Sequence, residues 1–171
     1  LRTLTPRRFD ADARELDVDV VLHGTGPLSE WAASVATGSP AAISGPGRGY
    51  TIDADAPAFL LAGDESAIPA MSQLLEQLPN GASVQVLVEV ADPAARIALP
   101  DHANATVEWG DVTPGARSGD ALVAAVRAVE LGPDVRIWAA GEAASMQRIR
   151  RYLFEERGLS RSIAVVRGYW K

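Results

Sequence analysis

The feature that most constrains the fold is a repeated alternation of strand and helix patterns after residue 57. Three segments repeat apolar side chains at helical spacing, at residues 66–78, 120–131 and 142–154. Short apolar runs typical of buried parallel strands lie at residues 58–62, 84–90, 106–109, 135–140 and 163–166, with loops expected at 93–104 and 113–119. Repeated β-α units predict an α/β fold with a doubly wound parallel sheet and right-handed crossovers.

Residues 1–49 follow a different pattern. Residues 15–23 alternate apolar and polar side chains, as a half-buried antiparallel strand does, and residues 41–44 are a second extended run. Between them, Ser29 can cap a short helix that carries Trp31. Two or three strands and one helix are too few for an independent sheet. We therefore expect residues 1–50 to be the C-terminal part of a β domain and residues 51–171 to be the α/β domain.

The composition argues against several classes of function. A net charge of −6 and an isoelectric point near 4.9 disfavour nucleic acid or an anionic membrane as the main partner. The chain has no cysteine and only two histidines, which excludes a thiolate nucleophile and disfavours a metal site built on those residues. No apolar run approaches the roughly 20 residues that span a bilayer, so we expect a cytoplasmic protein.

The turn after the first strand of the α/β region is a candidate binding site. A strand-to-helix turn directs free backbone N–H groups and the positive end of a helix at one point, where an anion such as a dinucleotide phosphate can bind. An ordinary helix N-terminus, capped by Asp64 or Ser66, is the alternative interpretation. The five residues of this turn are Gly63, Asp64, Glu65, Ser66 and Ala67.

Two further turns are expected at the same edge of the sheet, because ligands of such sheets bind outside the carboxyl ends of the strands. Residues 140–143 form the turn after the fourth strand, and residues 90–96, with Asp92 and Arg96, follow the second. An acid there favours a free ribose 2′-hydroxyl and an arginine a 2′-phosphate, so NADH and NADPH are both compatible. The alternative for Arg96 is an exposed loop charge.

Five separated segments occur in an order and spacing typical of one protein family. They are Arg2-Thr3-Leu4-Thr5, His23-Gly24 with Gly26-Pro27 and Trp31-Ala32, residues 62–70, residues 139–143, and Gly168-Tyr169-Trp170-Lys171. With these segments the chain resembles the siderophore-interacting proteins, flavin-dependent ferric-siderophore reductases related to ferredoxin reductases. The resemblance implies an FAD-binding antiparallel β-barrel domain followed by an NAD(P)H-binding α/β domain. Family members begin well upstream of the arginine motif, so we expect the first barrel strands to be missing.

The resemblance also implies roles for residues of the flavin-binding part. Arg2 would contact the FAD pyrophosphate, for which the hydroxyls of Thr3 and Thr5 are further donors, and Thr5 would lie at the flavin or ribityl group. Leu4 stands where the family usually has a tyrosine that packs on the isoalloxazine ring, and it can cover the ring but cannot stack on it. The second FAD motif corresponds to His23, Trp31 and Ala32.

For the α/β part, the resemblance implies that residues Gly63 to Ala67 and the group Gly141, Glu142 and Ala143 form the nicotinamide-nucleotide turns. Tyr169 and Trp170 would be the aromatic end that approaches the flavin, and Lys171 is a candidate for the anionic siderophore. Because Asp64 and Glu65 would repel phosphates, we expect the first turn to face the nicotinamide, with Ser66 and backbone amides as donors.

The implied chemistry is hydride transfer from NADH or NADPH to FAD, followed by one-electron transfer to the Fe(III) of a siderophore and release of Fe(II). Iron is then a substrate, and no resident metal site is expected. We find no plausible catalytic triad or carboxylate pair, in keeping with a reaction carried by cofactors. The alternative is a truncated, non-catalytic nucleotide-binding module.

Overall fold

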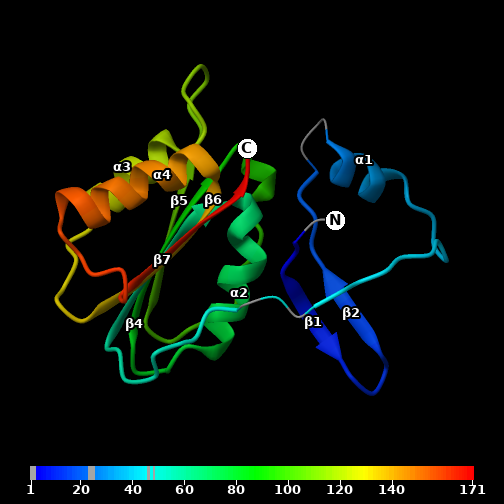
Figure 1. Ribbon diagram of the computed structural model, residues 1–171, viewed down its shortest axis with the longest axis horizontal. Coiled ribbons are helices and arrows are strands. Elements are labelled where there is room, and N and C mark those ends of the chain that lie inside the picture. Colours follow the sequence, from blue (N-terminus) through cyan, green and yellow to red (C-terminus); the bar gives the residue numbers. More distant parts are fainter. Residues whose placement is uncertain (1–2, 23–25, 46, 48) are drawn as a thin grey trace. The chain divides into compact units, whose positions relative to one another are not determined.

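The computed structural model describes residues 3–22, 26–45, 47 and 49–171 (Figure 1). The chain forms two compact units, Leu1–Thr51 and Ile52–Lys171. In the described residues, none of the helices has both the length and the apolar character needed to cross a membrane. The predicted residues Arg2 and His23 lie outside the described residues.

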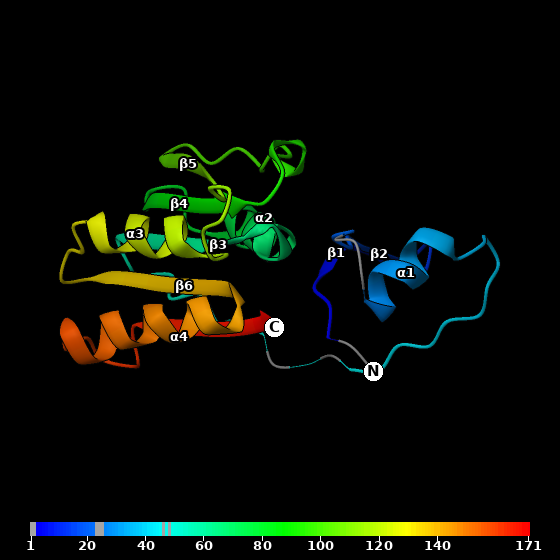
Figure 2. The same cartoon turned by 90° about the horizontal axis from the view of Figure 1, so that it is seen from above.

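The second unit is built on a five-stranded sheet in the order β5-β4-β3-β6-β7, with every pair parallel (Figure 2). The strands are β3 Ala58–Asp64, β4 Ser83–Val90, β5 Ala105–Asp111, β6 Val135–Glu142 and β7 Ala164–Trp170. The helices are α2 Ile68–Gln77, α3 Asp120–Ala128 and α4 Ala143–Arg151, with short helical turns at Glu65–Ala67, Pro93–Ala95 and Tyr152–Glu156. This topology confirms the predicted α/β fold with a doubly wound parallel sheet.

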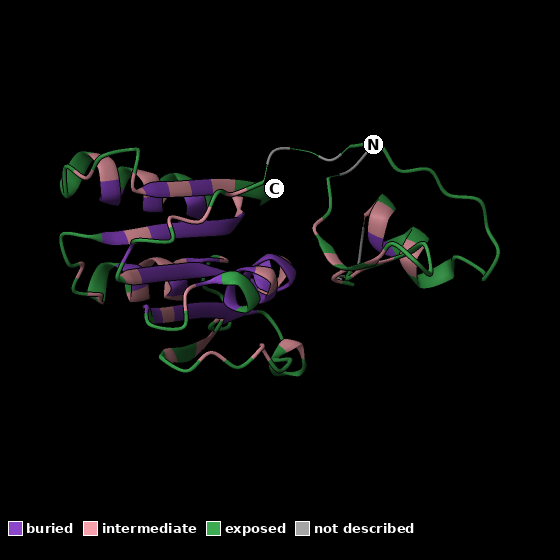
Figure 3. Ribbon diagram, turned by 90° about the horizontal axis from the view of Figure 1, so that it is seen from below, coloured by how far each residue is buried: buried purple, intermediate pink, exposed green. Residues whose placement is uncertain are grey.

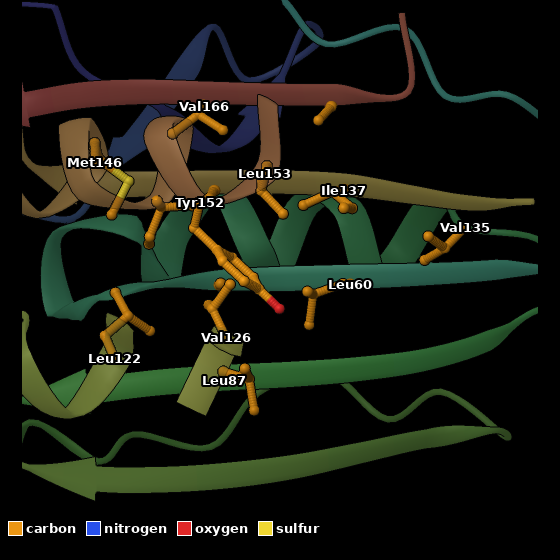
Figure 4. Close-up of a cluster of buried hydrophobic side chains, with 14 residues drawn as sticks. Leu60, Leu87, Leu122, Val126, Val135, Ile137, Met146, Tyr152, Leu153 and Val166 are labelled. Atoms are coloured by element: carbon orange, nitrogen blue, oxygen red, sulfur yellow. The ribbon is translucent and has the colours of Figure 1, made fainter. Parts of the chain in front are cut away.

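Alternate side chains of each strand reach opposite faces of the sheet. On β3, Leu60 and Ala62 join the buried cluster beneath α3 and α4, which Figure 4 shows with Val126 and Tyr152. The intervening residues Phe59 and Leu61 are also buried, but they lie outside that cluster, on the face that α2 covers. Both faces are therefore apolar, which explains the continuous apolar runs in the sequence, and the central strands are the most buried part of the unit (Figure 3).

Four strands, β3, β5, β6 and β7, extend further toward their carboxyl ends than their apolar runs predict. β3 continues through Gly63 and Asp64, which pair in register with Val88 and Glu89 of β4. β6 continues to Glu142, and β7 runs to Trp170, four residues beyond the predicted end at 166. The apolar pattern identifies only the buried part of a strand, and the polar residues that follow still join the backbone ladder. The predicted helix at 66–78 begins instead with a 3-10 turn, and α2 starts at Ile68.

The first unit contains a two-stranded antiparallel sheet, β1 Pro6–Asp10 and β2 Glu15–Val18, and helix α1 Pro27–Ser34. The strand expected over 15–23 ends at Val18, and residues 41–44 are not part of a strand. The prediction that Ser29 caps the helix is wrong. Gly26 is at the N-cap and Pro27 follows, where proline fits the first helical turn, while the Ser29 hydroxyl donates to the Val21 carbonyl at 3.2 Å.

Candidate functional site

The candidate site lies at the carboxyl ends of β3 and β6. The chain runs from β3 outward to β4 and β5 on one side, and returns to β6 and β7 on the other. The two neighbouring strands at which this direction reverses define the crevice where α/β sheets of this type bind ligands. Asp64 ends β3, Glu142 ends β6, and Trp170 ends β7 beside them.

The carboxylate of Asp64 connects three elements at this point, although its residue is only 3% exposed. Its Oδ1 accepts hydrogen bonds from the Ser66 amide at 3.0 Å and from the Ser66 hydroxyl at 2.5 Å. Its Oδ2 accepts from the Glu142 amide at 2.7 Å and from the Trp170 indole Nε1–H at 3.0 Å. Asp64 is thus the cap of the 3-10 turn, as the alternative interpretation held, and it also joins β3 to β6 and β7.

Two glycines allow the backbone to pack this closely. Gly141 has φ +152°, and a Cβ there would collide with the Asp64 carboxylate, 2.8 Å from its Cγ. At Gly63 a Cβ would lie 2.5 Å from both the Ala140 carbonyl oxygen and the Ala67 Cβ. Both predicted turn glycines are therefore required by the geometry at the ends of β3 and β6.

The helix N-termini at this edge are satisfied by carboxylates of the chain. Glu142 caps α4, with hydrogen bonds from the Ala144 amide at 2.8 Å and the Ser145 amide at 2.7 Å. Glu89, buried at the end of β4, accepts from the Gly119 amide and, at 2.8 Å, from the Leu122 amide at the start of α3. A nucleotide pyrophosphate would have to compete with these carboxylates for the amides, and it would be repelled by their charge.

Three carboxyl groups at the site have shifted pKa values. Burial raises the pKa of Asp64, against the opposing effect of its hydrogen bonds from Ser66, Glu142 and Trp170. Burial also raises the pKa of Glu65, and the nearby charge of Asp64 raises it further. At Glu142 burial acts in the same direction, but the hydrogen bonds from Ala144 and Ser145 outweigh it, so the pKa of Glu142 is lowered.

The lowered pKa of Glu142 gives a prediction for acid stability. Because the pKa is lower in the folded state, the contribution of Glu142 is complete above the usual value of about 4.5, and it is lost as the pH falls through the folded value. Glu142→Gln should lower the free energy of unfolding by about 1 kcal/mol at pH 7. The difference from wild type, measured by urea unfolding, should be smaller at pH 3 than at pH 7. A difference that is the same at both pH values would contradict this prediction.

The two aromatic residues at the end of β7 are held in different ways. The Trp170 indole donates to Asp64, as described above. Tyr169, which is 41% exposed, packs edge-on against Trp138 of β6, with ring centroids 6.4 Å apart and planes at 76°. Lys171, the candidate siderophore ligand, is exposed.

At the turn after β4, Arg96 pairs with Asp111 at the end of β5, with 2.6 Å between the guanidinium nitrogen and the carboxylate oxygen. Asp92 accepts a hydrogen bond from the Ala94 amide at 2.8 Å. The two residues that bear on the choice between NADH and NADPH are therefore both engaged within the unit. Ser66, which we expected to offer donors to the nicotinamide, likewise directs its amide and hydroxyl to Asp64.

The predicted flavin residues belong to the first unit. Thr3, Leu4 and Thr5 precede β1, and Trp31 and Ala32 lie on α1. Leu4 is 40% exposed and Trp31 is 48% exposed, so both leave apolar surface uncovered in the first unit.

Glu89 and the contact between Asp64 and Trp170 were missed from the sequence. An acidic residue near the end of an apolar strand pattern is the only sequence signal for Glu89. No local pattern could have indicated a contact between residues 106 positions apart. In the part of the chain that is described, histidine and acidic side chains nowhere gather in a group of three or more that could hold a metal ion.

The order of the five parallel strands, together with the preceding antiparallel strands, defines a class: the folds of the ferredoxin-reductase type. The CS-b5R domains of human Ncb5or, in the NAD+ form, have a similar fold, with a TM-score of 0.68 at 14% identity, over 98% of this chain and 55% of the other.

Within that class, the chain belongs to the siderophore-interacting protein family. The sequence profile of the siderophore-interacting protein family matches residues 56–171, and that of the siderophore-interacting FAD-binding domain matches residues 1–50. SipS from Aeromonas hydrophila, a siderophore-interacting protein of known structure, superposes with a TM-score of 0.84 at 31% identity, over 99% of this chain and 72% of the other. The family assignment confirms the resemblance found in the sequence.

Two curated relatives extend this comparison. An uncharacterized protein of Mycobacterium tuberculosis is 41% identical over 183 residues, which cover all of this chain and 65% of the relative. The ferric vibriobactin reductase ViuB of Vibrio cholerae is 30% identical over 99% of this chain and 64% of its own length. The chain thus spans a little less than two thirds of the length of each of these two relatives.

Proposed function

We propose that the protein reduces ferric siderophores, with NADH or NADPH as the source of electrons and FAD as the bound cofactor. The observation that carries the proposal is the presence, in one chain, of the family's flavin-binding segment and an α/β unit whose strand order reverses between β3 and β6. The similarity to a ferric vibriobactin reductase supports the reaction class.

In this proposal, residues of the first unit hold FAD. Arg2, Thr3 and Thr5 provide a cation and hydroxyl donors for the pyrophosphate and ribityl groups. Leu4 and Trp31 fit the flat ring, because each leaves a large part of its apolar surface exposed in the unit. His23 and Ala32 complete the second FAD motif. When bound, FAD supplies the conversion between two-electron and one-electron transfer.

The second unit binds the nicotinamide nucleotide at the ends of β3 and β6. The backbone amides at the start of α3 and α4 already donate hydrogen bonds to carboxylates of the chain, and these carboxylates are negatively charged. A neutral nicotinamide ring suits this environment better than a pyrophosphate does. Arg96, held by Asp111 near the turn after β4, is the candidate contact for the adenosine end.

The overall reaction balances as follows. One reduced nicotinamide nucleotide gives two electrons to two ferric siderophores, and the products are the oxidised nucleotide, one proton and two ferrous ions. Iron is held by the siderophore until it is reduced and released as Fe(II), so it is a substrate. Lys171 is the candidate contact for an anionic siderophore. We propose a cytoplasmic location, with neither nucleic acid nor a membrane as partner, in keeping with the acidic composition.

The proposal predicts a yellow protein that oxidises NADH or NADPH when a ferric siderophore is added. The complete protein, as it occurs in the cell, is purified and its flavin absorbance recorded. Ferrous iron is then measured with a ferrous-specific chelator, in anaerobic solution. A colourless protein that takes up no FAD and binds neither nucleotide would overturn the proposal. Saturable nucleotide binding without flavin would favour the non-catalytic nucleotide-binding module.

Replacement of Arg2 tests the flavin site directly. Arg2→Ala should weaken FAD binding about tenfold or more, because it removes a charged hydrogen-bond donor to the pyrophosphate. Arg8→Ala is the matched control, since the Arg8 guanidinium contacts Asp17 at 2.8 Å and Glu15 at 3.2 Å on the exposed hairpin. The dissociation constants are measured by flavin fluorescence. Equal FAD affinity in Arg2→Ala and wild type would show that Arg2 does not serve the cofactor.

A further inference from the structure

Asp64 has more hydrogen bonds than a helix cap requires. A cap needs one acceptor for one amide near the start of the helix, and Asn, Asp and Ser fill this position about equally well. Asp64 accepts this capping hydrogen bond from the Ser66 amide. It also accepts three more, from the Ser66 hydroxyl, the Glu142 amide and the Trp170 indole. Four donors converge on a group that is 3% exposed, and only an ionised carboxylate accepts from all of them.

The contact with Trp170 crosses the sheet. Asp64 lies on β3 and Trp170 on β7, and β6 lies between these strands. The side chain can pass the end of β6 because Gly141 has no Cβ, and a Cβ at that residue would fall on the Asp64 carboxylate. The missing side chain at Gly141 therefore leaves the space in which Asp64 of β3 contacts Trp170, the last residue of β7.

The hydrogen bond between Asp64 and Trp170 lies where the pairing of β7 with β6 becomes irregular. The register between β6 and β7 is regular up to Gly141 and Gly168, and it then shifts so that Glu142 pairs with Trp170. The shift interrupts the backbone ladder at the point where the strand ends. Tyr169 is held by its edge-on contact with Trp138, and Trp170 by the hydrogen bond to Asp64. Side chains thus fix both aromatic residues where the backbone ladder is irregular.

We propose that Asp64 is a positioning residue, which fixes Trp170 and the end of β7 against the nucleotide crevice without touching the reactants. The inference rests on the proposed function, since it assigns Asp64 to the geometry of the nicotinamide reaction. The same carboxylate holds the Glu142 amide at the start of α4, so one group sets the relative positions of both nicotinamide turns and the C-terminal aromatic pair.

The substitution Asp64→Asn in the complete protein tests this inference. The asparagine side chain has nearly the same shape, but its NH2 group must face at least one of the four donors. We expect kcat for nucleotide oxidation to fall about 10- to 100-fold, the size of effect that small misplacements of reacting groups produce. We expect the KM for the nucleotide to change far less, because Asp64 does not contact it.

A second measurement detects the hydrogen bond between the Trp170 indole and Asp64 directly. In protein labelled with 15N-tryptophan, the Trp170 indole N–H signal should shift and its hydrogen exchange should accelerate in Asp64→Asn. Glu89→Gln is the matched control, because Glu89 is as buried as Asp64 and pairs with it in register, but it caps α3 and has no hydrogen bond to β7. This control should leave the Trp170 indole signal in place.

Substitution of the partner completes the test. Trp170→Phe removes the indole donor, and if Asp64 acts through Trp170, the double variant should be no slower than the slower single variant. Unchanged kcat in Asp64→Asn, or effects of the two substitutions that multiply, would overturn the positioning role. A wild-type protein that is inactive and binds no nucleotide would instead overturn the proposed function, a result that is distinguishable from both.

Discussion

Gly141→Ala should lower the free energy of unfolding by about 3 kcal/mol or more. Two costs add at this residue. A φ of +152° is a conformation that L-residues rarely adopt, and such strain costs about 1–3 kcal/mol. The new Cβ would also occupy the space of the Asp64 carboxylate, so Asp64 must move and give up hydrogen bonds to the Glu142 amide and the Trp170 indole. Urea unfolding of the purified variant measures the loss.

Gly132→Ala is the matched control for this substitution. A Cβ at Gly132 would have no atom within 4 Å, and the backbone there does not have a positive φ. Its free energy of unfolding should stay within about 0.5 kcal/mol of the wild-type value. If Gly141→Ala were as stable as Gly132→Ala, Asp64 would have another way to reach β7, and the described geometry would not be required.

The fold was predictable from the sequence where burial decides it. The strands β3, β4 and β6 are buried on both faces, so their apolar runs mark them clearly, and α2, α3 and α4 each present one apolar side. The hairpin strand β1 Pro6–Asp10 gave no such signal. Arg8 lies within it and donates hydrogen bonds to Asp17 and Glu15 of β2 across the pair, which the order of residues along the chain does not reveal.

The residues of the candidate site were predictable in kind but not in arrangement. The turns after β3 and β6 are at a shared edge because parallel strands end together, and Gly63 and Gly141 mark close approaches of the backbone. The sequence does not indicate which acceptor the donor groups of Ser66 and Trp170 bind. Asp64 accepts hydrogen bonds from the amide and hydroxyl of Ser66. It also accepts one from the Trp170 indole, because tertiary packing brings β7 beside β6.

At the N-termini of α3 and α4, carboxylates of the chain accept the hydrogen bonds that phosphates accept in many nucleotide-binding sheets. Substitution of Glu89 tests this replacement. Glu89 accepts hydrogen bonds from the Gly119 and Leu122 amides at the start of α3, and it is 2% exposed. Glu89→Ala leaves both amides without this partner, and each buried unsatisfied donor costs about 1–3 kcal/mol. The free energy of unfolding should therefore fall by about 2–6 kcal/mol.

Glu108→Ala is the comparison for Glu89→Ala. Glu108 lies on the adjacent strand β5, but it is exposed and accepts from the Gln85 side chain at 3.0 Å, so its loss should cost less than about 0.5 kcal/mol. Hydrogen exchange of the Leu122 amide should accelerate in Glu89→Ala and not in Glu108→Ala. Equal losses of stability in the two variants would mean that Glu89 contributes no more than a surface charge.

Sulfate should then partly restore the stability of Glu89→Ala. The substitution frees the amides at the N-terminus of α3, and a cavity of about 100 Å³ lies beside them, lined by Glu89, Gly110 and Ala121. An anion that binds there stabilises the folded state in proportion to its occupancy. The gain in unfolding free energy with sulfate should be larger for Glu89→Ala than for the wild-type protein, which controls for the general effect of the salt and in which Glu89 accepts from these amides. Equal gains would show that the amides of α3 do not accept an anion, and that Glu89 is only a structural cap.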